Sequence, residues 1–273
     1  MTISLAPRGP FSLPSPLVVA MTDDSGEAVA LLAVWAPGAG EVEVDFVSDL
    51  PAERVERVER HAARVLSLDA DGSGLAEVGE RDPVVGRLLE EAGGRRPVCF
   101  GTPFEAAVWA VLSQRVSMAQ AGRAKDALAS ALGTRMEIGG EEVLAFPGPR
   151  ALASLESFEG VWASKLERIR ALAGAALGGD LDPAFLRGMQ LDAALAHLQS
   201  LPGIGPFGAM LVLARGAGHP DVPPPTLRRF RAAVRSAYGL EEEPDEAKLA
   251  ELSEAWRPYR AWVTWLLRSA DSG

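Results

Sequence analysis

Three short segments in the first fifty residues of the chain are rich in β-forming apolar residues, and the third of them alternates apolar and polar positions. In the third segment, Val42, Val44 and Phe46 are separated by charged side chains. A period of two residues is typical of a strand with one buried face. Asp, Ser, Pro and Gly residues stand between the segments, where they favour turns. We therefore predict three antiparallel strands over residues 17–21, 29–35 and 41–47, joined by turns at 23–26 and 37–40.

The pattern changes to a helical period after residue 51. Arg and Glu fill the positions between apolar residues that recur every three or four places, at Val55, Val58, Ala62 and Val65. This pattern predicts an amphipathic helix over residues 52–66 whose apolar stripe covers one face of the sheet. Residues 1–95 are thus expected to form a small α+β domain with an antiparallel sheet, and Gly93-Gly94 mark its end.

Helical periodicity dominates the rest of the chain and is broken at one tight turn. Leu191, Leu195 and Leu198 lie at helical spacing, and helix-forming residues return from 209 to 215. Between them lies Leu201-Pro-Gly-Ile-Gly-Pro-Phe-Gly208. The sequence therefore predicts that residues 96–273 form an all-α domain in which this hairpin joins two helices.

The two glycines of the hairpin indicate phosphate binding. Gly203 and Gly205 lack a Cβ, so another chain can approach closely, and amide N–H groups at the start of the next helix can face a phosphate oxygen. Such a contact does not depend on base sequence. An ordinary helix–helix turn is the alternative for the glycine pair taken alone. We predict that the hairpin binds DNA through Gly203, Ile204, Gly205, Phe207 and Gly208.

Composition excludes several classes of protein. The chain has 273 residues, of which 48% are hydrophobic, and this is enough for one large or two modest domains. Its one cysteine, Cys99, excludes an internal disulfide framework and a cysteine-ligated iron–sulfur cluster. The three histidines lack metal-ligand spacing, so we expect no metal. No apolar run reaches a membrane span and no signal peptide is visible, which predicts a cytoplasmic protein.

The net charge of −10 argues against nucleic-acid binding, but its distribution weakens that argument. Residues 1–100 carry 9 basic and 17 acidic side chains, whereas residues 101–240 carry 14 and 12. The hairpin therefore lies in the segment with a positive balance. Arginines cluster just after it, at Arg228, Arg229, Arg231 and Arg235. This arginine cluster can be interpreted either as a contact with a DNA duplex or as a solvated helix face.

Four blocks of the second half of the chain resemble the helix-hairpin-helix DNA glycosylase superfamily, and within it the 3-methyladenine DNA glycosylase II (AlkA-type) branch. The resemblance covers residues 97–268, and the order and spacing of the blocks match. The blocks are residues 104–117, residues 162–176 with Lys165 and Arg168, the hairpin with residues 221–226 after it, and residues 255–262. This resemblance implies a glycosylase fold, and residues 1–95 resemble the N-terminal domain of the same branch.

The resemblance implies removal of a damaged base from duplex DNA, with the nucleotide first flipped out of the helix. Arg115 matches the family's wedge, which fills the gap in the base stack, and Gln114 and Ser117 flank it on the DNA side. A guanidinium can stack on bases and bond to them. An arginine paired with a nearby carboxylate is the alternative role for Arg115.

One catalytic position departs from the family's pattern. Superfamily members place an aspartate at the start of the helix after the hairpin helix, and here that position falls on Pro225 or Thr226. Neither side chain can stabilise the positive charge that develops on the sugar. Asp221 lies several residues earlier and is the nearest carboxylate, although a turn cap is its alternative role. Asp221 and Thr226 are the catalytic candidates.

The resemblance also places a pocket for the flipped base. Phe207 stands where the branch has a tryptophan, Met210 and Leu211 follow it, and Arg268 replaces an aromatic residue on the last helix. An aromatic box attracts a cationic base, and Phe207 alone provides less of that attraction. The tryptophans Trp109, Trp162, Trp256, Trp262 and Trp265 are interpreted as core residues, because they lie on apolar helical stripes.

Two functions remain open at this point, besides a helical protein that binds something other than DNA and uses the hairpin only as structure. The first is a monofunctional glycosylase that excises alkylated bases in base excision repair. The second is a catalytically impaired relative that binds lesions as a repair accessory. A lyase is not expected, since the hairpin has no lysine. We expect a monomer that binds damaged double-stranded DNA in the cytoplasm, associated with the nucleoid. It should need no cofactor, although hairpin carbonyls can hold a monovalent cation, and it should not bind membranes.

Overall fold

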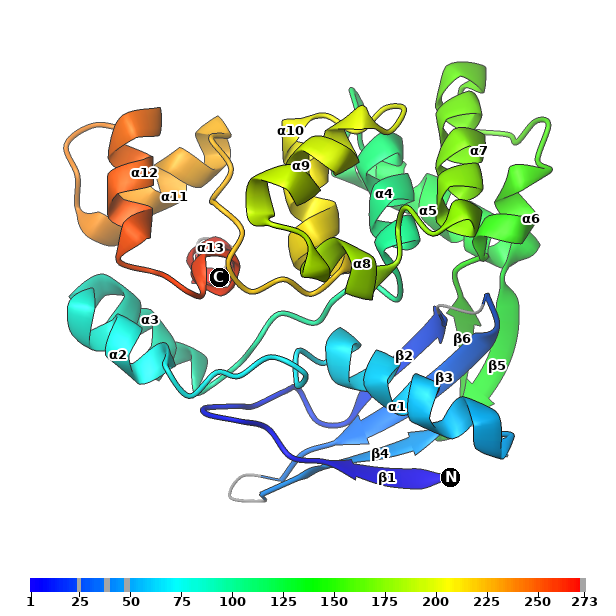
Figure 1. Ribbon diagram of the computed structural model, residues 1–273, viewed down its shortest axis with the longest axis horizontal. Helices are drawn as coiled ribbons and strands as arrows, with labels where there is room; N and C mark the ends of the chain where they lie inside the picture. Colours follow the sequence, from blue (N-terminus) through cyan, green and yellow to red (C-terminus); the bar gives the residue numbers. More distant parts are fainter. Residues whose placement is uncertain (24–25, 37–39, 47–49, 271–273) are drawn as a thin grey trace.

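The computed structural model describes residues 1–23, 26–36, 40–46 and 50–270. A four-stranded antiparallel sheet lies beneath a larger group of helices, and the N-terminus belongs to the sheet (Figure 1). The predicted class, a small α+β part followed by a helical glycosylase core, is confirmed. The predicted turns at 23–26 and 37–40 fall partly outside the described residues.

The sheet contains one strand more than predicted. Its order is β1-β4-β3-β2, with β1 (Thr2–Leu5), β2 (Leu17–Thr22), β3 (Ala28–Val34) and β4 (Val42–Phe46). Strand β1 pairs with β4, and Leu5 lies opposite Val42. Four residues with a single buried side chain give too short an alternation to be recognised in the sequence. The predicted helix is α1 (Ala52–Val65), which packs Val58, Ala62 and Val65 against the sheet.

Thirteen further helices follow α1 in the described part of the chain, and local capping sets the start of several of them. Thr102 accepts a hydrogen bond from the Glu105 amide at the start of α4, with Pro103 in the first turn. The helices after α1 are α2 (Leu75–Arg81), α3 (Pro83–Ala92), α4 (Pro103–Leu112), α5 (Met118–Leu132), α6 (Pro149–Ala153), α7 (Ala163–Gly178), α8 (Pro183–Gly188), α9 (Leu191–Ser200), α10 (Pro206–Leu211), the π-helix η1 (Val212–Gly216), α11 (Arg228–Tyr238), α12 (Glu246–Glu254) and α13 (Arg260–Ala270).

A β-hairpin interrupts the range that was predicted to be all-helical. Strands β5 (Thr134–Ile138) and β6 (Glu141–Ala145) pair around Gly139 and Gly140, which both have positive φ. Two such glycines suit the tight turn of a two-residue hairpin. The prediction of an all-α second domain was therefore wrong at this point. The β5–β6 hairpin packs beside β2 and β3 and joins the two parts of the molecule (Figure 1).

Side-chain packing divides the chain differently from the predicted boundary at residue 95. Leu75 and Val85, from α2 and α3, share a core with Phe230 and Trp256 of the C-terminal helices. The Asp82 carboxylate caps α3 by accepting from the Val84 amide at 3.0 Å, and it also accepts from Trp256 Nε1 at 3.1 Å. Helices α2 and α3 thus pack with α11–α13 and not with the sheet that precedes them.

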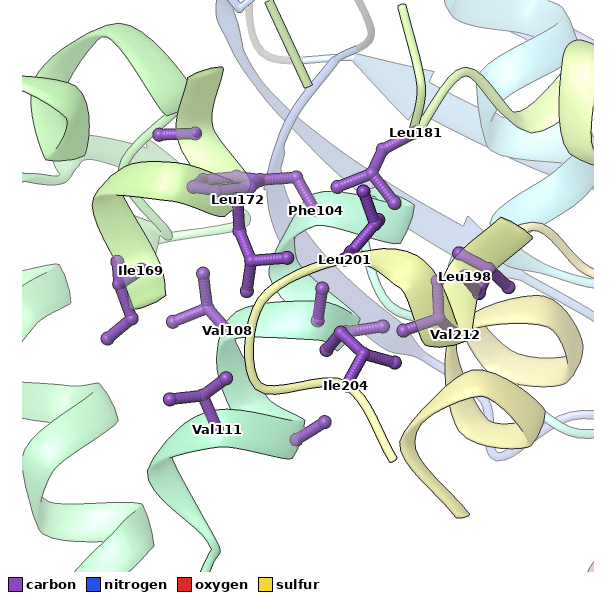
Figure 2. Packing of buried hydrophobic residues seen from close by; sticks show 14 of the residues in the cluster. Phe104, Val108, Val111, Ile169, Leu172, Leu181, Leu198, Leu201, Ile204 and Val212 are labelled. Carbon is purple, nitrogen blue, oxygen red and sulfur yellow. The ribbon is translucent and has the colours of Figure 1, made fainter. Parts of the chain in front are cut away.

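Helix α4 lies at the centre of the helical core. Its side chains Phe104, Val108 and Val111 are at most 3% exposed. They pack against Ile169 and Leu172 of α7 and against Ile204 of the hairpin (Figure 2). Full burial of one such side chain contributes about 1.5–3 kcal/mol. This core fixes the hairpin against α4.

Among the described residues, no helix combines the length and the apolar character that a bilayer span requires.

Candidate nucleic-acid interface

The hairpin has one buried side and one open side. Helix α9 ends at Ser200, α10 begins at Pro206, and Leu201 and Ile204 between them are buried. Gly203 has φ +85°, and a Cβ there would lie 2.7 Å from Arg168 Cδ, so this position requires glycine. A Cβ on Gly205 would meet nothing within 4 Å. The open side of the turn is therefore formed by Gly205 and the first turn of α10, where backbone amides have no partner within the helix.

The predicted wedge occupies the loop between α4 and α5, next to the hairpin. Arg115 is exposed and has φ +56°, in the left-handed region that side chains other than glycine rarely adopt. No salt bridge to Arg115 is found within the described part of the chain, so the alternative of a carboxylate partner gains no support there. The Ser117 hydroxyl caps α5 and forms a capping box with Gln120. A contact of Ser117 with DNA stays a prediction.

One glutamine connects the wedge loop to the hairpin. Gln114 Nε2 donates to the Gly203 carbonyl at 2.7 Å, and Arg168 Nη1 donates to Gln114 Oε1 at 3.0 Å. The buried Lys165 ammonium donates to the Leu112 carbonyl at 2.6 Å, at the end of α4. Burial lowers the pKa of Lys165, and the charge of Arg168 lowers it further. The side chains from α7 thus hold the loop and the hairpin in one rigid unit.

The four predicted pocket residues line one cavity. Phe207, Met210, Leu211 and Arg268 enclose about 60 Å³ together with Val222, Pro223, Pro225, Thr264 and Trp265. A second cavity of about 430 Å³ adjoins it and shares Phe207, Arg215, Pro225, Trp265 and Arg268. Phe207 is 37% exposed, so its ring lies at the entrance. The lining of the cavity begins at Phe207, within the hairpin.

Neither catalytic candidate lines these cavities. The two oxygens of Asp221 accept from Arg260 at 2.7 and 3.0 Å, and Arg257 adds a third contact at 2.9 Å. Arg260 is only 4% exposed, so this is a largely buried ion pair that fixes the start of α13. Thr226 is exposed and is not among the residues that line either cavity. The geometry agrees with a structural role for Asp221 and gives no support to either residue as a catalytic group.

The predicted arginine cluster is divided by its ion pairs. Arg228 lies 3.7 Å from Glu243, and Arg231 lies 3.4 Å from the same carboxylate. The Arg228 side chain is 89% exposed, so water screens this pair and it costs little to break. Arg229 lines the larger cavity. Arg228 and Arg229 therefore remain available to a phosphate backbone.

The structure corrects the predicted roles of three residues, two of which line the cavities. Arg215 lies on the π-helix η1 and lines both cavities; helical periodicity gives no sign of a π-turn. Trp265 packs against the C-terminal core and also lines both cavities, whereas Trp162 is 59% exposed, so the prediction of a core role is wrong for Trp162. The core role of Trp256 and Trp262, at 0% and 4% exposure, is confirmed. An apolar stripe alone does not distinguish a core from the wall of a cavity.

The hairpin offers backbone oxygens but no metal cluster. Within the described ranges, no group of three or more His, Cys, Asp or Glu side chains could hold a metal ion. The carbonyls of Leu201, Gly203 and Gly205 each accept one hydrogen bond, from Ile204, Gln114 and Ala209. Each oxygen keeps one lone pair, so a monovalent cation at the hairpin stays a prediction.

Comparisons with known proteins agree with this geometry, although no family model matches the chain. DNA-3-methyladenine glycosylase of Bacillus subtilis is 25% identical over 249 residues, which cover 89% of this chain and 82% of that protein. DNA-3-methyladenine glycosylase 2 of Escherichia coli is 31% identical over 186 residues, 66% of this chain and 61% of that protein.

The fold is shared with a solved structure. The 3-methyladenine DNA glycosylase from Archaeoglobus fulgidus superimposes with a TM-score of 0.79 at 21% identity and covers 99% of this chain and 98% of that one. The ordered blocks, the hairpin and these relatives lead to one assignment. The chain belongs to the helix-hairpin-helix DNA glycosylase superfamily, in its 3-methyladenine DNA glycosylase II branch.

Proposed function

We propose that this protein is a monofunctional DNA glycosylase that flips alkylated bases out of duplex DNA and excises them by hydrolysis. The observation that carries the proposal is the grouping of three parts on one rigid unit. These parts are the open hairpin, the exposed Arg115 that Gln114 ties to it, and the cavity behind Phe207. Two relatives that bear glycosylase names support the same activity.

In this proposal the hairpin grips the strand that carries the lesion. Amides at the start of α10 bind a phosphate, and Arg115 enters the space that the flipped nucleotide leaves. Flipping costs a few kcal/mol, and least for a damaged base, so part of the selectivity arises before chemistry. The left-handed backbone at Arg115 projects the side chain from the loop in advance, which reduces the ordering that binding would otherwise require.

The chemistry must proceed without a carboxylate in the cavity wall. Water attacks C1′ of the sugar as the bond to the base breaks, and the residues lining the two cavities include neither Asp nor Glu in the described part of the chain. Alkylation weakens the bond and makes the base a better leaving group. The hairpin presents no lysine amine for a Schiff base, so cleavage of the DNA backbone is not part of the proposal.

We also propose the setting of this activity. The substrate is double-stranded DNA with a damaged base, bound by one copy of the chain in the cytoplasm. Exposed Arg228 and Arg229 supply positive charge beside the hairpin despite the net charge of −10. Binding should therefore weaken steeply with salt.

The test is single-turnover base release from duplexes that carry 7-methylguanine or O2-methylthymine. We expect release of at least one base. Gly205→Glu should abolish it, because the added carboxylate points into open space where a phosphate would approach. The matched control is Gly174→Glu, at an exposed glycine of α7 with equally open surroundings.

Two outcomes would overturn the proposal. Tight binding to an abasic-site duplex without release of any base would make the protein a lesion-binding accessory. Equal activity of Gly205→Glu and Gly174→Glu would show that the hairpin is not the DNA anchor.

A further inference from the structure

The two adjoining cavities are cationic. Arg215 and Arg268 line both of them, and Arg229 lines the larger one. The other lining side chains are apolar or uncharged, so no carboxylate enters either wall within the described residues. Burial lowers the pKa of Arg215 and of Arg268, and each is lowered further by a neighbouring guanidinium. A guanidinium nevertheless remains protonated at neutral pH.

Two polar atoms beside the smaller cavity lack hydrogen bonds. Arg215 Nε and Thr264 Oγ1 are buried and have no partner among the residues that the structure describes. Both residues line the cavity that holds the predicted base-binding side chains. Buried polar atoms are normally satisfied, and an exception in a binding site indicates a ligand that completes the bonds. Arg215 Nε can only donate, so that ligand must carry an acceptor.

A positively charged wall changes which base can leave. When the bond between C1′ and the base breaks, the electron pair departs with the base. A neutral base becomes an anion, a water oxygen bonds to C1′, and the proton lost by that water is taken up by the base. Guanidinium groups in a cavity shielded from water stabilise the developing anion. A base with a fixed positive charge leaves as a neutral molecule, gains nothing from them and is repelled on entry.

We propose that Arg215, Thr264 and Arg268 make this site selective for neutral alkylated bases with a hydrogen-bond acceptor, by binding that acceptor and stabilising the base as it leaves. The selectivity rests on the glycosylase function proposed above. It also gives the chain a source of catalysis in place of the missing aspartate: charge is stabilised on the departing base and not on the sugar.

The experiment compares a neutral and a cationic lesion in one duplex sequence. Single-turnover release is measured for O2-methylthymine and for 7-methylguanine with the native chain, Arg268→Met, Arg268→Lys and Thr264→Val. We expect Arg268→Met to lower the ratio of the O2-methylthymine release rate to the 7-methylguanine release rate at least about tenfold. Arg268→Lys should restore part of that ratio, and Thr264→Val should lower the ratio in the same direction.

The control is Arg135→Met, because Arg135 lies on strand β5 and pairs with Glu142 away from the cavities. Thr264→Val removes an unsatisfied hydroxyl at constant volume, so its folding should be preserved. Equal slowing of both bases by Arg268→Met, or no change in the ratio of the two rates, would overturn the proposed selectivity.

A binding arm separates this proposal from the glycosylase function. Duplexes with 2′-fluorinated lesion nucleotides resist cleavage, so their Kd values report recognition alone. We expect the native chain to bind the duplex with O2-methylthymine more tightly than the one with 7-methylguanine, and Arg268→Met to lose that preference. If no base is released but the O2-methylthymine duplex is bound more tightly, the proposed glycosylase function is wrong and the proposed selectivity for neutral bases stands. If bases are released but the two duplexes are bound equally well, the proposed selectivity is wrong.

Discussion

At the scale of single residues, Arg115 carries the most informative backbone. A left-handed conformation costs a residue with a Cβ about 1–2 kcal/mol. The residues on both sides enforce it, since Gln114 binds the Gly203 carbonyl and Ser117 caps α5. Strain that neighbours over-determine is typical of functional sites. The sequence could identify Arg115 as a wedge by resemblance, but its conformation depends on contacts with the hairpin.

Replacing this residue should separate strain from function. Arg115→Gly should be about 1 kcal/mol more stable to unfolding than Arg115→Ala, because glycine adopts positive φ without steric cost. Both variants should lose preference for an abasic-site duplex over intact duplex. Urea unfolding checks the expected difference in stability, and Kd values for the two duplexes check the expected loss of preference. Equal stability of both variants would show that the loop relaxes, and a retained preference would exclude Arg115 as the wedge.

His219 should make stability depend on pH. Its Nδ1 accepts from the Asp221 amide at 3.1 Å, which requires the neutral ring. Burial lowers the pKa of His219, and the nearby Asp221 opposes that shift only in part. The stabilisation is therefore complete above the unfolded pKa of about 6.5 and is lost as pH falls toward the folded value.

Urea unfolding of the native chain and of His219→Gln between about pH 8 and pH 5 tests this direction. The native chain should lose more stability across that interval than the variant does. Equal losses in the two proteins would show that His219 does not contribute to the acid sensitivity.

At the scale of elements, the wedge loop and the hairpin act as one unit through Gln114. Gln114→Ala removes the bond to Gly203 and leaves Arg168 without its acceptor. We expect a loss of about 1–2 kcal/mol in stability and a several-fold weaker preference for abasic DNA. Gln190→Ala is the control, since Gln190 is exposed at the start of α9. An unchanged preference would mean that the two elements bind DNA independently.

The Asp221–Arg260 pair joins the segment after η1 to α13. Asp221→Asn leaves the buried Arg260 with only the more distant Glu254 carboxylate, at 3.8 Å, and should lower the free energy of unfolding by about 3 kcal/mol. Base release measured well below the unfolding midpoint should stay within a few-fold of the native rate, because Asp221 does not line the cavities. Asp126→Asn, at an exposed position, should change stability by less than about 0.5 kcal/mol. A large loss of release by folded Asp221→Asn would instead make it catalytic.

At the scale of the whole molecule, α2 and α3 belong to the C-terminal core. Leu75 is 4% exposed and packs in the cluster that contains Trp256. Leu75→Ala should cost about 2–4 kcal/mol. Hydrogen exchange should then quicken in α11–α13 more than in the sheet. The matched variant Leu31→Ala, in the core under α1, should show the opposite distribution. If Leu75→Ala loosened the sheet first, the predicted boundary at residue 95 would describe the cooperative units after all.

The sequence by itself determined the features that depend on local pattern. Short β-rich runs between turn residues predicted three of the four strands, helical periodicity predicted α1 and α9, and the Pro-Gly-Ile-Gly turn placed the hairpin. These features follow from backbone preferences that a few neighbouring residues decide. The resemblance added four residues of the cavity, because it relates Phe207 to the hairpin block and Arg268 to the last helix.

Tertiary structure alone decided how distant segments meet. The grouping of α2 and α3 with α13, the burial of Asp221 against Arg260 and the tie from Gln114 to Gly203 all join residues far apart in the chain. The π-turn that carries Arg215 has no local signal in the sequence, and Gly216 at its end lies so close to Pro103 of α4 that a Cβ there would be 2.7 Å from Pro103 Cα. Sequence periodicity specifies which face of an element is apolar. Only the folded chain determines what that face, and each charge beside it, contacts.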